Sequence, residues 1–283
     1  MEKLTPEGLR EIFIDLQDAK LDAVVVGGQA VNLWAYQYYV NAPELNQYLP
    51  FASEDLDFYG GRVEAMLCQD VLGGQLNLNR DFDPSPNAGV LLVNREEKIL
   101  RIDVLASVYG LNDSEVVGSA LPFIGKGILQ GIQIKVLHPV LCLEGKLRCL
   151  RGLPQGGRQD LKHASMSAIC VREMLKGLCT PETPRIGLKQ VERVLDIALR
   201  EDGLSAWYRH HLEVERAIPA EHLEQLHDEK WEKFCEIRLP QWVEQIREKR
   251  DRYVSVMQRI EDRGAAQSYV PQPKRESSPD LEL

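Results

Sequence analysis

Hydrophobic residues follow two spacings along the first 180 residues, one typical of helices and one typical of strands. Apolar residues at helical spacing predict a helix over 5–20, with Thr5 as its cap and Pro6 as its first residue. A strand over 22–27 and a helix over 28–37 follow. The other elements predicted here are a helix of about ten residues from Val63, strands over 76–79, 90–94, 99–105 and 132–137, a helix from Pro139 to the glycine-rich break at 152–157, and a helix over 158–178.

Two long segments in this part lack a clear period. Residues 36–52 are rich in Tyr, Asn and Pro and are interpreted as an inserted loop, and residues 108–131 as a glycine-rich connection. Beyond a linker at 180–187 the pattern is helical over 188–202, 204–216, 219–237 and 240–263. We therefore expect an α+β fold: a mixed-sheet domain over 1–180, a helical domain over 181–265 and a disordered tail over 266–283.

Composition excludes several classes of protein. The chain has 283 residues, 44% of them hydrophobic, and no apolar run approaches the roughly 18 residues that a membrane helix needs. The first residues lack the pattern of a secretory signal, so we expect a cytoplasmic protein without a membrane partner. No two of the 6 cysteines have the CxxC spacing of a zinc knuckle, and we expect buried free thiols.

The charge is unevenly distributed. The net charge of −9 gives no general attraction to nucleic acid. From Lys146 to Lys176, however, the segment contains seven Lys or Arg residues and two acidic residues, which gives it a local charge of +5. Such a segment either meets phosphates or forms a solvated helix face, and the sequence leaves both readings open.

Three aspartates are the candidate chemistry. Asp55 and Asp57 lie two residues apart on a predicted strand, which places both carboxylates on one face and Leu56 on the other. Asp103 lies alone in the apolar strand 99–105, where it needs either a metal ion or an ion pair, for instance with Arg101. The second Asp-x-Asp, at 81–83, is surrounded by Pro and Asn and is interpreted as a turn.

This arrangement favours phosphoryl or nucleotidyl transfer. Gly27 and Gly28 follow a buried strand and allow the backbone to approach a triphosphate at the start of a helix. Two Mg²⁺ ions about 3.5–4 Å apart would then hold the α-phosphate, with Asp55 and Asp57 bridging both. Asp103 would complete the ion on the acceptor side and help remove the proton of the acceptor hydroxyl.

The same residues resemble a known family. Gly27-Gly28-Gln29-Ala30, Ser53-Glu54-Asp55-Leu56-Asp57-Phe58 and Ile102-Asp103-Val104 are similar to the motifs of the nucleotidyltransferase fold, and the middle one is closest to the AbiEii/AbiGii-type toxins and their tRNA-modifying MenT relatives. The resemblance covers roughly residues 20–165. It implies Mg²⁺ or Mn²⁺ as cofactor and an NTP as substrate, with Gly27, Gly28 and Ser53 among the nucleotide-binding residues.

The resemblance also implies two further catalytic residues. In that branch a lysine on a later helix contacts the nucleotide phosphates, and an aspartate at the start of the next helix supports catalysis. Lys146 and Asp160 match these positions. The alternatives are a surface charge for Lys146 and a helix N-cap for Asp160. Two features depart from the family pattern: 27 positions separate Gly28 from Asp55, and no second acid follows Asp160 closely.

We therefore expect a metal-dependent enzyme that moves an NMP from an NTP to a hydroxyl acceptor. The resemblance favours the 3′ end of tRNA or another RNA as acceptor, and implies a toxin with a cognate antitoxin as partner. One alternative is transfer to a small molecule or to a protein hydroxyl. The other is a regulatory module that binds nucleotide without turnover.

Overall fold

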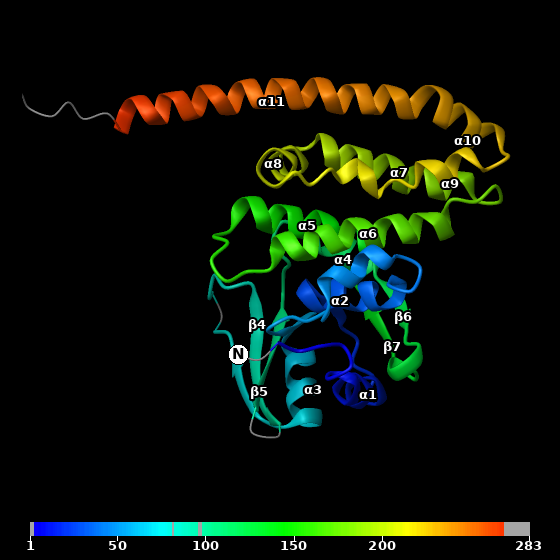
Figure 1. Cartoon of the computed structure of the whole chain (residues 1–283). Helices are drawn as coiled ribbons and strands as arrows, with labels where there is room; N and C mark the ends of the chain where they lie inside the picture. Colours follow the sequence, from blue (N-terminus) through cyan, green and yellow to red (C-terminus); the bar gives the residue numbers. More distant parts are fainter. Residues whose placement is uncertain (1–2, 81, 96–97, 269–283) are drawn as a thin grey trace, which may run out of the picture.

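A seven-stranded mixed sheet forms the first part of the molecule, and helices form the second. The computed structural model describes residues 3–80, 82–95 and 98–268. The strand order is β3-β4-β5-β2-β1-β7-β6. The strands are β1 (Val24–Val26), β2 (Leu56–Tyr59), β3 (Gln75–Leu78), β4 (Asn87–Arg95), β5 (Lys98–Leu105), β6 (Leu121–Ile124) and β7 (Gln133–Val136). The predicted α+β class with a mixed sheet and a helical C-terminal region is confirmed (Figure 1).

The centre of the sheet fixes the positions of two aspartates. β2 alternates between buried residues, such as Leu56, and half-buried ones, such as Asp57, as expected for a strand whose faces differ. β2 runs parallel to β5 with Asp57 opposite Asp103, and antiparallel to β1 with Val26 opposite Asp57. Val26, Asp57 and Asp103 therefore form one row across three neighbouring strands.

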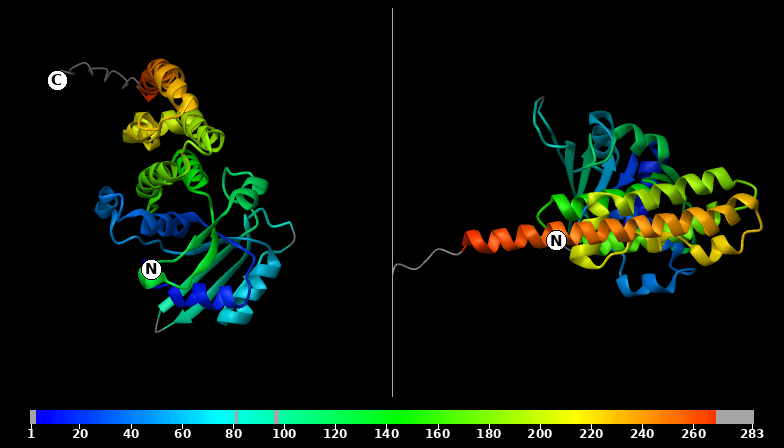
Figure 2. Two further views of the ribbon diagram at one scale, coloured as in Figure 1. Left: turned by 90° about the vertical axis from the view of Figure 1, so that its right-hand side faces the viewer. Right: turned by 90° about the horizontal axis from the view of Figure 1, so that it is seen from above.

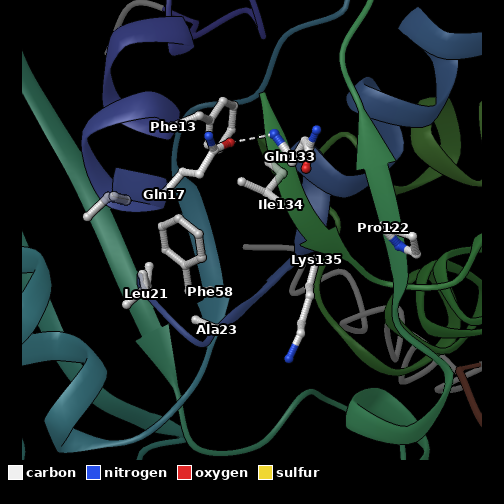
Figure 3. Close-up of a pocket in the computed structure, with 10 residues that line it drawn as sticks. Phe13, Gln17, Leu21, Ala23, Phe58, Pro122, Gln133, Ile134 and Lys135 are labelled. Carbon is white, nitrogen blue, oxygen red and sulfur yellow. Dashed lines mark hydrogen bonds between the residues drawn. The ribbon is translucent and has the colours of Figure 1, made fainter. Parts of the chain in front are cut away.

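Helices cover both sides of the sheet. α1 (Arg10–Asp18) and α3 (Arg62–Leu72) lie on one side, and α2 (Gly27–Tyr38) lies on the other, beneath the later helices (Figures 1 and 2). A cavity of about 310 Å³ remains between α1 and β7. Figure 3 shows Phe58 in its wall, one residue along β2 from Asp57 and on the opposite face of the sheet.

Two helices belong to both hydrophobic cores. α5 (Pro139–Gly152) places Leu141 in the core of the sheet and Leu143 in the core of the helical region, and α6 (Asp160–Leu178) does the same with Met166 and Val171. Both helices are thus buried on two sides. They join the sheet to the helical layers, so the part of the chain that belongs to the helical core begins well before residue 180.

The remaining helices stack on α5 and α6, with α11 on the outside (Figure 1). They are α7 (Pro184–Leu199), α8 (Glu201–His210), α9 (Ala220–Glu224), α10 (Glu229–Lys233) and α11 (Leu239–Ser268), with a 3-10 turn at Val214–Ala217 and a π turn at Phe234–Arg238. Among the described residues, no helix has the length and apolarity required to span a bilayer. The tail predicted to be disordered lies, from residue 269 onward, outside the described residues.

Several predicted boundaries were wrong. The first helix begins at Arg10, because residues 6–9 form a turn in which the Thr5 hydroxyl accepts a hydrogen bond from the Gly8 amide. The predicted linker at 180–187 overlaps α7, which begins at Pro184. The predicted helix over 219–237 is divided between α9 and α10, and Asp228 caps the second of these.

Both segments interpreted as loops contain regular structure. Within 36–52, α2 continues to Tyr38 and a 3-10 helix spans Pro43–Tyr48, with Leu45 fully buried. Within 108–131 the chain forms α4 (Asp113–Ser119), β6 and a 3-10 turn. β6 lies at the edge of the sheet, where Pro122 is tolerated although it lacks an amide hydrogen.

A buried carboxylate ties α5 to the helices above it. Glu144 is 4% exposed and accepts hydrogen bonds from Arg148 at 2.6 Å, Arg200 at 2.5 Å and Arg193 at 3.0 Å. The three arginines come from α5, from the residue before α8 and from α7. This cluster fixes the orientation of the helix that also carries Lys146.

We expect Glu144→Gln to destabilise the protein by about 2–4 kcal/mol, because three guanidinium groups lose their shared counter-charge. Their partial exposure keeps the loss below that of a fully buried pair. Urea unfolding measures it. Glu192→Gln, which removes an exposed pair with Arg238, is the matched control and should change stability by less than about 1 kcal/mol. Equal losses in the two variants would contradict the role given to Glu144.

Candidate active site

The glycine pair is needed because other side chains occupy the space beside it. Gly27 has φ of 65°, and a Cβ on it would lie 2.0 Å from Asp57 Oδ2. A Cβ on Gly28 would lie 2.4 Å from Ser53 Oγ and 2.9 Å from His163 Cε1. The first turn of α2 therefore packs directly against an acidic and a polar side chain. Among the described residues, no side chain caps the N-terminus of α2, and the first amides of a helix have no partner within the helix.

Asp55, Asp57 and Asp103 lie together. Each offers a carboxylate oxygen, and the three oxygens lie within 4.8 Å of one another. Asp55 lies in a bend just before β2 rather than in the strand, so the prediction that both residues belong to a strand was wrong for Asp55. The cluster nevertheless forms, because the bend keeps Asp55 beside Asp57. Three carboxylate oxygens fit Mg²⁺ or Mn²⁺, which prefer hard oxygen ligands.

The acidic cluster changes the protonation of its central member. Burial, together with the charges of Asp55 and Asp103, raises the pKa of Asp57 to about 8, although Lys146 and Arg101 act in the opposite direction. Burial also raises the pKa of Asp103, against the effect of Arg101. A cation among the three carboxylates would relieve this repulsion, as expected for a site shaped to bind one.

Asp103 also has the ion pair that the sequence left open as its alternative. Arg101 Nε donates to both carboxylate oxygens, at 3.1 and 3.0 Å, and Asn87 Nδ2 donates to Oδ1 at 3.5 Å. Asp103 is 5% exposed, so these contacts compensate much of the cost of burying it. Asp103 is therefore both a member of the acidic cluster and half of an ion pair.

Lys146 and Asp160 are partners in a second charged group. Lys146 Nζ lies 3.0 Å from Asp160 Oδ1, and Arg158 Nε lies 2.6 Å from Asp160 Oδ2. Burial would raise the pKa of Asp160, but Lys146 and Arg158 outweigh it and lower the pKa. Gln159, not Asp160, is the residue that precedes α6. The alternatives of a helix cap and a plain surface charge therefore do not describe these two residues.

One cavity of about 140 Å³ joins the two groups. Six of the eight predicted site residues line it; Gly27 packs against Asp57 at its edge, and Asp103 lies opposite Asp57 on the next strand. The predicted residues in its wall are Gly28, Ser53, Asp55, Asp57, Lys146 and Asp160, joined by Glu54, Gly157, Arg158, Gln159 and His163. Acidic oxygens form one side of the cavity and cationic nitrogens the other.

His163 was not selected from the sequence, because it has no metal-ligand spacing, and it borders this cavity. It is 2% exposed, and burial together with the charges of Lys146 and Lys162 lowers its pKa to about 3, so the ring is neutral. Its Nε2 atom is buried and has no hydrogen-bond partner among the described residues. Asp160 and His163 lie three positions apart on one helix, and this spacing was the available signal that both face the same way.

Three arginines of the segment 146–176 pair with acids from elsewhere in the chain, and Lys176 pairs with an acid inside the segment. Arg148 and Arg151 pair with Asp202, Arg172 pairs with Glu44, and Lys176 pairs with Glu173. Lys162 donates to the Pro50 carbonyl oxygen at 3.1 Å. Ion pairs therefore interrupt the basic segment, and two of its seven cations, Lys146 and Arg158, line the cavity.

Comparisons with protein-family models, curated proteins and solved structures find no match to this chain. The functional assignment therefore rests on the residues and their geometry.

We expect Gly27→Ala to abolish divalent-cation binding, because the new methyl group would overlap the Asp57 carboxylate and the positive φ would add about 1–2 kcal/mol of strain. Calorimetric titration with Mn²⁺ measures this. Gly131→Ala is the matched control: its φ of 95° is also positive, but nothing lies within 4 Å of the added Cβ. Cation binding as tight in Gly27→Ala as in the control would show that the Gly27–Asp57 contact does not shape the site.

The raised pKa of Asp57 predicts a dependence of stability on pH. Without metal, the folded state retains a proton on Asp57 up to about pH 8, whereas an unfolded aspartate loses it near 3.8. The contribution of Asp57 to stability therefore falls as pH rises from about 4 to 8. We expect Asp57→Asn to remove this pH dependence. Between pH 4 and pH 8, the free energy of unfolding of the variant should therefore rise by roughly 1–3 kcal/mol relative to that of the wild type.

Urea unfolding in EDTA across this pH range measures the effect. Parallel curves for the wild type and for Asp57→Asn would contradict the assignment of the raised pKa to Asp57.

Proposed function

We propose that the protein is a divalent-metal-dependent nucleotidyltransferase that moves an NMP from an NTP to a hydroxyl acceptor. The observation that supports this most strongly is the joint placement of Asp55, Asp57 and Asp103 beside the Gly27–Gly28 turn, with a lysine across the same cavity. An acidic cluster, a glycine turn and a cationic side chain are the three elements that a metal–triphosphate complex requires.

Two groups of hydrogen-bond donors at the cavity are suited to bind phosphate oxygens. Lys146 uses one of its three ammonium hydrogens for Asp160, which leaves two for phosphate oxygens. The amides of the first turn of α2 supply further donors without a side chain in the way. Asp160 is fixed by Arg158 as well, so the ammonium group of Lys146 is held in place before substrate binds.

The cluster of Asp55, Asp57 and Asp103 would provide the cation site, and a bound cation would neutralise phosphate charge and make the acceptor hydroxyl more acidic. In the reaction, the acceptor oxygen forms a bond to the α-phosphorus while the bond from that phosphorus to the bridging oxygen breaks. Pyrophosphate leaves with the electron pair, and the hydroxyl proton passes to solvent or to a carboxylate of the cluster. The neutral His163 ring closes the inner wall of the cavity.

The test is transfer of label from an α-³²P-NTP in Mg²⁺ or Mn²⁺. We expect Asp57→Asn to lower the rate by on the order of 10²-fold or more, because a ligand that stabilises developing charge is removed. The matched control is Asp83→Asn, in the other Asp-x-Asp. Asp83 Oδ1 accepts from the Ser85 amide in an exposed turn, an interaction that an asparagine side chain can keep.

The same assay decides the acceptor. Total RNA, small-molecule alcohols and the protein itself are offered separately, and the labelled product identifies the class. The RNA acceptor and the toxin role rest on the family resemblance alone. Equal labelling by wild type and Asp57→Asn would contradict the proposed function, as would tight NTP binding without transfer to any acceptor in either metal.

A further inference from the structure

Arg101 forms an ion pair with one aspartate of the acidic cluster. It precedes Asp103 by two residues on β5, so both side chains lie on the face of the sheet that carries the acidic cluster. Its Nε contacts both carboxylate oxygens of Asp103 at 3.1 and 3.0 Å. Its charge acts on all three aspartates, since Asp103, Asp55 and Asp57 all influence its pKa.

The charge balance favours a single metal ion. When a cation is bound and all three carboxylates are ionised, the three aspartates together carry −3. The guanidinium group lowers the charge of the cluster to −2, which one divalent ion neutralises. Both oxygens of Asp103 already face Arg101, and Asn87 approaches one of them. The carboxylate that would bind an ion on the acceptor side is therefore occupied.

The rest of the Arg101 side chain remains available. Only Nε contacts Asp103, and among the described residues the two terminal nitrogens have no hydrogen-bond partner. The side chain is 40% exposed, whereas Asp103 is 8% exposed. A planar guanidinium group with free terminal nitrogens is suited to bind phosphate oxygens.

We propose that Arg101 replaces the second divalent cation of this site: Nε holds Asp103, the terminal nitrogens contact the reacting phosphate, and a single metal ion binds at Asp55 and Asp57. This inference rests on the proposed function and refines it, because the same cluster without Arg101 would be expected to take two ions. Arg101 is then a fixed cation that needs no metal to neutralise the acceptor side.

The experiment counts bound ions directly. Mn²⁺ is titrated into the full-length protein with and without an NTP analogue that has a methylene group between the α- and β-phosphorus, and free Mn²⁺ is measured by its electron paramagnetic resonance signal. We expect one tightly bound ion per wild-type chain in both conditions. Arg101→Gln and Arg101→Met, which lack the charge, should each take up a second ion with the analogue bound, and Arg101→Lys should retain one.

Arg95→Gln is the matched control. Arg95 lies on the neighbouring strand β4, pairs with Asp15 on an exposed surface at 3.6 Å, and should leave the count at one. Circular dichroism and thermal unfolding identify any variant that fails to fold. The number of ions bound by the wild type tests the proposal even if a variant does not fold.

Two bound ions in the wild type would overturn the inference, as would a count of one in both neutral Arg101 variants. In either case the protein still binds metal and nucleotide, so the proposed function stands. Failure to bind either Mn²⁺ or the analogue would instead count against the proposed function itself.

Discussion

The Asp57 carboxylate lies where Gly27 has no side chain, and the organisation of the site depends on this contact. β1 and β2 pair so that Val26 faces Asp57, and the chain turns into α2 at the next residue. A glycine with positive φ allows the helix to start directly beside the acid. The N-terminus of α2 and the acidic cluster therefore lie side by side, which is the arrangement that an anionic ligand carrying a metal ion needs.

The helical region contributes the opposite charge. α5 and α6 are buried against the sheet on one side and against α7 to α11 on the other, so their positions are fixed by two cores. Lys146 lies on α5 and Asp160 on α6. Their side chains form an ion pair, although a glycine-rich connection separates the two helices in the sequence. The cluster around Glu144 then links α5 to the outer helices. Packing far from the cavity thus determines where the ammonium group of Lys146 lies.

Local pattern predicted much of the fold, and non-local pairing explains what it missed. The alternation of β2 and the apolar run of β5 correctly placed Asp57 and Asp103 on strands. The parallel register that sets Asp57 opposite Asp103 joins residues 46 positions apart, and no local pattern encodes it. β6 was missed because four residues that include Pro122 give too short a signal for an edge strand.

In the candidate site, too, the sequence predicted some residues, whereas others depend on contacts between distant parts of the chain. The residues of the acidic cluster, the glycine pair and Lys146 could be selected from the sequence, whereas the roles of Arg101, Arg158 and His163 depend on contacts that only the folded chain shows. Arg101 was recognised as a possible partner of Asp103, but the sequence could not show that one guanidinium group would contact both oxygens. The sequence left two readings of the basic segment open, because some of the counter-charges come from distant elements.

We propose that the acidic cluster of Asp55, Asp57 and Asp103 provides one cation site beside the Gly27–Gly28 turn. A crystal of the protein grown with Mn²⁺ and an NTP analogue, with data collected at the manganese absorption edge, tests it directly. The account predicts an anomalous peak at Asp55 and Asp57, with the triphosphate between that peak and Lys146. A manganese peak elsewhere, or a nucleotide bound away from the Gly27–Gly28 turn, would contradict it.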